Sequence, residues 1–179
     1  MPIKSLQEKF EHELADIYDA EHQLLKGQQE MLAEATDDTL KEMLRTHFEQ
    51  TKGHIKNLEG VFSAIGEEPK REMCAGAKGL VTEAKKMLEE TQGAPKIRDC
   101  AIAGSAAKAE HYEISSYRDL IAGAEIMGQN EVVSLLQMNL EQEESTAILI
   151  EQSVPDLLQK AMKQSDMKET KGAQASPTH

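Results

Sequence analysis

Three glutamates interrupt the apolar faces of predicted helices. Glu21, Glu110 and Glu143 each lie near the middle of such a face. The stripe around Glu110 advances by three or four residues, the spacing that keeps side chains on one side of a helix, and comprises Cys100, Ala103, Ala107, Ile114, Tyr117, Ile121 and Ala124. A buried carboxylate is costly unless it is paired, hydrogen-bonded or bound to a metal. These acids therefore indicate a polar centre inside the fold.

Further side chains of ligand type share these faces. In four-helix di-metal proteins two helices give one Glu each and the other two give a Glu-x-x-His pair. Carboxylates can bridge two ions and imidazole can end the coordination, a mixture that suits iron or manganese. The ligand set predicted for at most two ions per chain is Glu21, His54, Glu110, Glu113 and Glu143. Weaker candidates are His47, Gln50 and Glu144.

A hydrogen-bonded network without metal is the alternative interpretation. The same acids would then pair with His47, His54, Tyr18 and Tyr117. A single interior Glu would favour that network, but three on different helices favour a cation, because clustered carboxylates repel one another. His111 is predicted not to be a ligand. Tyr117 is predicted to be core, with a hydroxyl that supports a ligand.

The helices that position these residues are predicted from apolar periodicity and from helix-breaking residues. The 179 residues are 3% aromatic and contain five prolines, none inside a periodic segment. Helices are expected at about 5–35, 39–65, 95–126 and 130–153, with a partly helical crossover at 67–94 and a short helix at 156–162 after Pro155. This is an all-α, ferritin-like up-down four-helix bundle. We expect one domain over residues 1–163 and a disordered polar tail over residues 164–179.

Composition excludes several classes of function. The net charge of -12 argues against a nucleic-acid or anionic-membrane partner. There is no run of 18 apolar residues and no phosphate-binding glycine motif. Cys74 and Cys100 have no metal or CxxC spacing and indicate reduced thiols in a cytoplasmic protein.

Four segments resemble one known family. They are DIYDAEHQL from Asp16, HFEQTKGHI from His47, EHYEISSY from Glu110 and LEQEEST from Leu140. These resemble the YciF/YciE group of bacterial ferritin-like stress proteins, over roughly residues 3–162. The resemblance implies a homodimer with a carboxylate di-metal centre. This chain departs from the group at Gln50 and Ala147, where relatives usually or often have an acid, and His54 adds a ligand one turn from Gln50.

Two functions are consistent with these features. The first is a carboxylate-bridged di-iron or di-manganese protein linked to bacterial stress, reacting with a small oxidant, dioxygen or peroxide, in a ferroxidase- or peroxide-type reaction if it is an enzyme. The alternative is a non-catalytic dimeric structural stress protein whose acidic core is vestigial or partly metallated.

Overall fold

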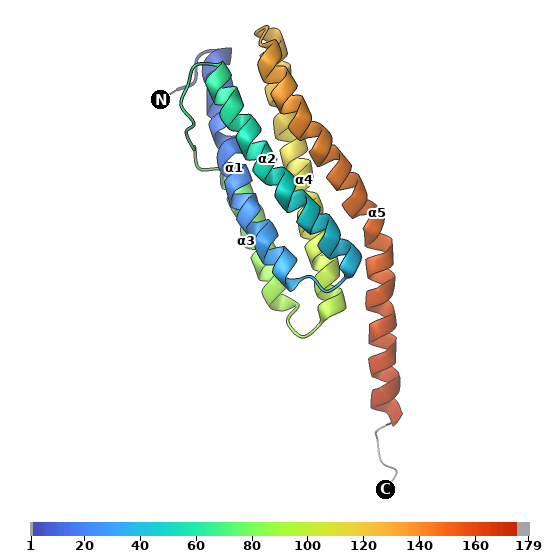
Figure 1. The fold of residues 1–179 in the computed structure, drawn as a ribbon. Helices are drawn as coiled ribbons and strands as arrows, with labels where there is room; N and C mark the ends of the chain where they lie inside the picture. The colour runs from blue at the N-terminus through green and yellow to red at the C-terminus, as the bar shows by residue number, and fades with distance from the viewer. Residues whose placement is uncertain (1, 175–179) are drawn as a thin grey trace.

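Long helices make up almost all of the structure, a computed structural model that describes the backbone of residues 2–174 and the side chains of residues 2–164. The helices are α1 (Leu6–Glu34), α2 (Asp38–Ala64), α3 (Ala75–Glu90), α4 (Pro95–Ile126) and α5 (Asn130–Gln174). Helices α1, α2, α4 and α5 form the bundle, in which α1 pairs with α2 and α4 with α5 (Figure 1). The all-α, ferritin-like bundle predicted from the sequence is confirmed.

The helix ends are formed by residue types that favour such positions. Ser5 accepts a hydrogen bond from the Glu8 amide at 3.1 Å, and the Asp37 carboxylate accepts from the first amides of α2. Gly66 and Gly128 follow α2 and α4 with φ of 74° and 70°, which glycine adopts without steric cost.

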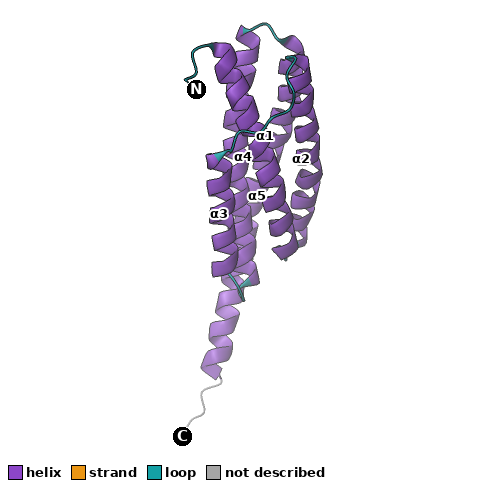
Figure 2. Ribbon diagram, turned by 90° about the vertical axis from the view of Figure 1, so that its left-hand side faces the viewer, coloured by secondary structure: helices purple, strands orange, loops and turns teal. Residues whose placement is uncertain are grey.

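Helix α3 belongs to the crossover between α2 and α4 and packs along α1 and α4 (Figure 2). The predicted partly helical connection is confirmed. The approach of α3 to α4 depends on Gly76, because a Cβ there would lie 2.7 Å from Cε2 of Tyr112. The crossover helix is therefore a fixed cover on one side of the bundle.

Helix α5 differs from the prediction. It continues through Pro155 to Gln174 and runs past the end of the bundle, so residues 156–162 are not a separate short helix (Figure 1). Leu157 and Ala161 remain buried, and Lys160 pairs with Asp37 at 2.7 Å. These contacts stabilise the helix beyond the proline. The tail predicted as disordered from residue 164 is helical to Gln174, and its last residues, 175–179, lie outside the described part.

The apolar core is divided into two clusters along the bundle. One contains Phe10, Leu14 and Phe62, and the other contains Leu40 and Ile102. A layer of buried polar side chains crosses the bundle: His47, Thr51 and His54 separate the two clusters along α2. Glu21, Glu110 and Glu143 belong to the same polar layer and interrupt the first cluster on the other three helices. No helix of the described residues combines the length and apolarity needed to cross a membrane.

Candidate metal centre

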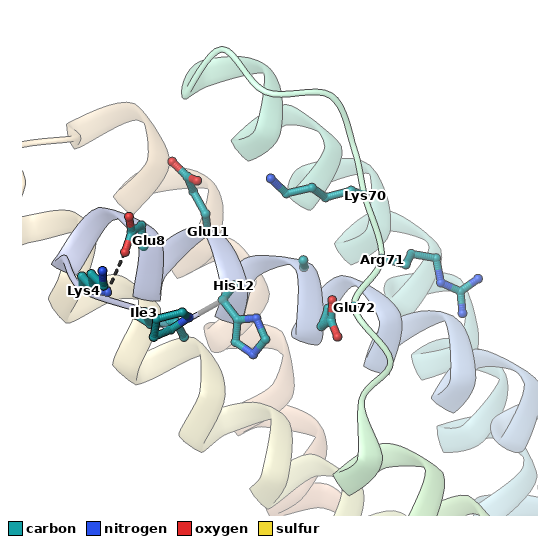
Figure 3. A pocket seen from close by; sticks show the side chains of 10 residues that line it. Ile3, Lys4, Glu8, Glu11, His12, Lys70, Arg71 and Glu72 are labelled. Carbon is teal, nitrogen blue, oxygen red and sulfur yellow. Dashed lines mark hydrogen bonds between the residues drawn. The ribbon is translucent and has the colours of Figure 1, made fainter.

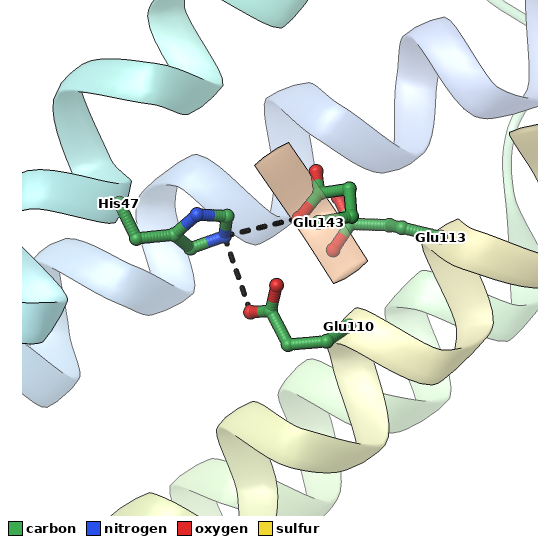
Figure 4. A group of neighbouring side chains, drawn as sticks. All are labelled: His47, Glu110, Glu113 and Glu143. Carbon is green, nitrogen blue, oxygen red and sulfur yellow. Dashed lines mark ion pairs between the residues drawn. The ribbon is translucent and has the colours of Figure 1, made fainter. Parts of the chain in front are cut away.

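Four helices each send acids or imidazoles into the polar layer. His47, Glu110, Glu113 and Glu143 form one group whose ligand atoms all lie within 4.8 Å of one another. Figure 4 shows their side chains converging from α2, α4 and α5. Glu21 and His54 form a second group of the same kind with Glu143. Glu143 therefore belongs to both groups, the position of a bridging carboxylate.

Each imidazole directs one ring nitrogen at the carboxylates. His47 Nε2 lies 3.1 Å from Glu110 Oε1 and 3.5 Å from Glu143 Oε2 (Figure 4). His54 Nδ1 lies 2.8 Å from Glu143 Oε1 and 3.6 Å from Glu21 Oε1. Neither ring nitrogen has a hydrogen-bond partner in the described residues, despite these short distances. The ring nitrogens and carboxylate oxygens are therefore close together without the alignment that an N–H···O hydrogen bond requires.

The centre holds most of the unpaired buried polar atoms. Within the described side chains, eleven buried nitrogen and oxygen atoms have no hydrogen-bond partner. Eight of the eleven belong to the centre: Glu21 Oε2, His47 Nε2, His54 Nδ1, Glu110 Oε2, both Glu113 oxygens and both Glu143 oxygens. Native folds seldom leave such atoms unpaired, and a local concentration of them is accounted for by a bound ion or by water. The donors therefore fit a metal centre.

Burial and mutual repulsion control ionisation here. Burial, reinforced by neighbouring carboxylates, raises the pKa of Glu21 and raises that of Glu113 strongly. Burial also raises the pKa values of Glu110 and Glu143 to about 7. Burial lowers the pKa of His54, but Glu143 and Glu21 outweigh it and raise that pKa to about 10. Without a cation, these buried acids therefore hold protons at a higher pH than free carboxyl groups do.

Neutral acceptors hold the two imidazoles in place. His54 Nε2 donates to Gln142 Oε1 at 2.9 Å, which leaves Nδ1 to face the acids. Thr146 Oγ1 donates to Gln50 Oε1 at 3.4 Å and so accepts from His47 Nδ1 at 3.3 Å. Each ring thus presents a lone pair inwards when it is neutral, as a metal-ligating histidine does.

Tyr117 and Asn139 support the acid on α1. The Tyr117 hydroxyl, fully buried, donates to Glu21 Oε1. It accepts a hydrogen bond of 3.0 Å from Asn139 Nδ2. Tyr117 therefore lies beside a candidate ligand, as predicted from the sequence.

The structure brings together all five residues predicted as ligands, although their role as ligands stays a prediction. His47, only a weaker candidate from the sequence, lies with these five residues. His47 is 3% exposed, whereas Phe48 is half-buried. Gln50 supports His47 through Thr146.

The other two candidates considered from the sequence lie away from the centre. Glu144 is directed outwards and pairs with Arg118 at 2.6 Å. His111 is exposed and contacts Glu151, in agreement with its predicted exclusion from the ligand set.

A surface hollow of about 440 Å³ lies away from this centre, beside the start of α1 and the loop before α3 (Figure 3). Two of its charged side chains have local partners: Glu8 accepts from the Lys4 amide at 2.6 Å, and Arg71 pairs with Asp19 at 2.7 Å. The two ligand groups found among the described side chains both lie in the polar layer instead.

A bundle with acids and histidines at its centre is of the ferritin-like class. The chain belongs to the family described as a domain of unknown function (DUF892), which matches residues 5–163. It is 34% identical to protein YciF of Escherichia coli K12 over 149 residues, covering 83% of this chain and 89% of YciF. The resemblance to the YciF group is thereby confirmed.

Solved structures agree with this assignment. The crystal structure of the E. coli stress protein YciF matches with a TM-score of 0.83 and 31% identity, over 88% of this chain and 99% of that one. YcfI of Rhodopseudomonas palustris, described as a candidate structural protein, matches with a TM-score of 0.81 and 34% identity, over 83% and 94%. A Xanthomonas campestris protein, XCC3681, shares the fold at 19% identity and a TM-score of 0.73, over 90% and 99%.

Proposed function

We propose that this protein is a ferritin-like metalloprotein of the bacterial stress response that binds at most two iron or manganese ions between its helices. The observation that carries the proposal is the pair of buried ligand groups joined by Glu143. Glu143 is fully buried, and neither of its oxygens has a hydrogen-bond partner among the described residues. A carboxylate in that state is well suited to bridge two cations.

The donors divide between two ions. His47, Glu110 and Glu113 would hold one ion and Glu21 with His54 the other, with Glu143 common to both. Four carboxylates carry four negative charges when ionised, which two divalent cations balance. Oxygen-rich donors with one imidazole per ion favour iron or manganese over softer metals. This charge balance supports two divalent cations.

The proposed reactivity is ferroxidase- or peroxide-type. A bound iron pair supplies one-electron redox chemistry with dioxygen or peroxide. The chain's own contribution is to exclude bulk water, because the ligand side chains are at most 3% exposed, and to fix the imidazoles through Gln142 and Thr146. Tyr117 fixes the Glu21 carboxylate.

Metal analysis of matched variants tests the proposal. Protein reconstituted anaerobically with ferrous iron or manganese should retain up to two ions per chain after desalting. Glu143→Gln should lose most of this metal, because the bridge loses its charge. Glu144→Gln, one residue on and paired outwards with Arg118, should bind as the wild type does. Equal retention by both variants, or none by the wild type, would reject the assignment.

A structural function is the second candidate. The resemblance to the YciF group implies that Gln50 and Ala147 replace residues that are usually or often acids, and Ala147 is buried without offering a ligand. A chain with these substitutions could serve as a dimeric scaffold with a partly metallated core. Reconstitution to well below one ion per chain would favour this candidate.

We further propose a homodimer located in the cytoplasm. Exposed apolar side chains on α5, Met138, Ile148 and Leu149, offer contact area for a second copy. The free thiols of Cys74 and Cys100 suit a reducing compartment. Sedimentation analysis at micromolar concentration should give the mass of two chains, and a single-chain mass would reject the dimer.

A further inference from the structure

A small cavity adjoins the metal centre at its His47 and Glu110 end. It lies among α1, α2, α3 and α4 and has a volume of about 20 Å³. Leu80, Val81 and Ala84 of the crossover helix line one side of it. Its lining is mainly apolar, with a few polar side chains that include Gln28 and Glu110. The volume suits one water or one molecule of two heavy atoms.

The hydrogen bonds of Thr51 determine how the Gln28 amide is oriented. Thr51 Oγ1 donates its single proton to the carbonyl of His47 at 3.1 Å. The hydroxyl can therefore only accept from Gln28, and Gln28 Nε2 donates to it at 3.0 Å. The amide nitrogen is thus fixed towards Thr51, and the amide oxygen is the free atom.

Gln28 Oε1 is an acceptor without a donor. The side chain is 5% exposed, and this oxygen has no hydrogen-bond partner among the described residues. Glu110 Oε2, on another residue of the same lining, is unpaired as well. Leaving a buried acceptor unpaired costs its full desolvation, so the wall favours a guest that carries O–H donors.

We propose that this cavity is a binding site for hydrogen peroxide beside the Glu110 end of the centre. Peroxide has two heavy atoms and an O–H at each, which matches the cavity volume and unpaired acceptors on two lining residues. Dioxygen fits the volume but has no donor for Gln28 Oε1. This inference deepens the proposed function, since it names the oxidant that the centre would meet.

Diffraction from crystals of the metal-free full-length protein, with and without a peroxide soak, tests binding directly. Peroxide is not consumed there by bound iron. We expect a solvent molecule at Gln28 Oε1 before the soak and elongated two-atom density in its place afterwards. A single spherical peak that does not change at any peroxide concentration would indicate a structural water only and would overturn the proposal, as would an empty cavity.

Two variants separate this site from the metal site. Gln28→Leu removes the acceptor and Ala84→Leu fills the cavity from α3, while both leave every proposed metal ligand in place. Gln29→Leu makes the same chemical change at an exposed position of α1 and is the matched control. Metal content should be unchanged in all three, whereas metal missing from the wild type as well would count against the proposed function and not against this site.

Steady-state kinetics give the second readout. With iron-loaded protein, Gln28→Leu should raise the apparent KM for peroxide roughly tenfold, the value of one lost hydrogen bond. Ala84→Leu should raise it further, and Gln29→Leu should not change it. Unchanged KM in both cavity variants, with unaltered density after the soak, would refute the site.

Discussion

In the metal-free protein the free energy of unfolding should fall as the pH rises. In the metal-loaded protein it should increase over the same range. In the metal-free fold the pKa values of Glu110 and Glu143 are about 7, whereas the unfolded chain ionises these groups near 4.5. Between those values the folded state keeps protons that the unfolded state has released. The free energy of unfolding therefore falls as the pH rises through this window.

His54 acts in the same direction. Its folded pKa of about 10 exceeds the ordinary value of 6.5, so its stabilising contribution is present below pH 6.5 and is lost as the pH rises towards 10. A single carboxyl shifted from 4.5 to 7 corresponds to about 3 kcal/mol when fully titrated. The two glutamates interact and do not add fully. We expect a loss of about 2–4 kcal/mol between pH 5 and pH 7.5.

Urea denaturation measures this directly, with chelator and with saturating metal. The loaded protein should gain stability over the same range, because protons compete with the ions for the carboxylates. In the metal-free protein Glu143→Gln should flatten the fall, while Glu144→Gln should keep it. Metal-free stability that is constant or rises from pH 5 to pH 7.5 would refute the reasoning on the buried acids.

Two further perturbations follow from individual contacts. Gln142→Leu removes the acceptor of His54 Nε2 and should weaken metal affinity about 10–100-fold, measured by competition with a chelator. The change Gln152→Leu at an exposed position should leave the affinity unchanged. Equal affinities of the two variants would show that the acceptor is dispensable. Asp99→Ala leaves the Thr36 amide and hydroxyl without their acceptor, at 2.6 and 2.7 Å, and should lower the free energy of unfolding by about 1–3 kcal/mol in thermal or urea melts; an unchanged midpoint would contradict the role of this buried carboxylate.

The helices were predictable because apolar periodicity and end signals agree along most of the chain. The acids at 21, 110 and 143 could be recognised because each interrupts such a pattern. The helix end predicted at Pro155 was wrong because α5 is continued by the contacts of Leu157 and Lys160 with other helices. Such contacts leave no signal in the sequence around the proline. Which polar residues are buried could be predicted on helices that have only one possible apolar stripe.

Helix α2 is where the pattern was ambiguous. His47 and Phe48 are neighbours, and hydrophobicity alone selects the phenylalanine for the interior. The structure turns Phe48 to the rim, with Lys52 Nζ 4.3 Å from its ring centroid, and places His47 among the acids. Only the position of the acids on other helices decides which neighbour is buried. A single sequence does not show at which level of the bundle the acids of the other helices lie.

The central claim is that two cations share Glu143. Anomalous diffraction at the iron edge, from crystals reconstituted anaerobically with ferrous iron, tests it most directly. We predict two peaks in the polar layer on either side of the Glu143 carboxylate, one near His47 and Glu110 and the other near His54 and Glu21. Peaks confined to surface acids, or an absence of anomalous signal in this layer at full iron concentration, would contradict the account.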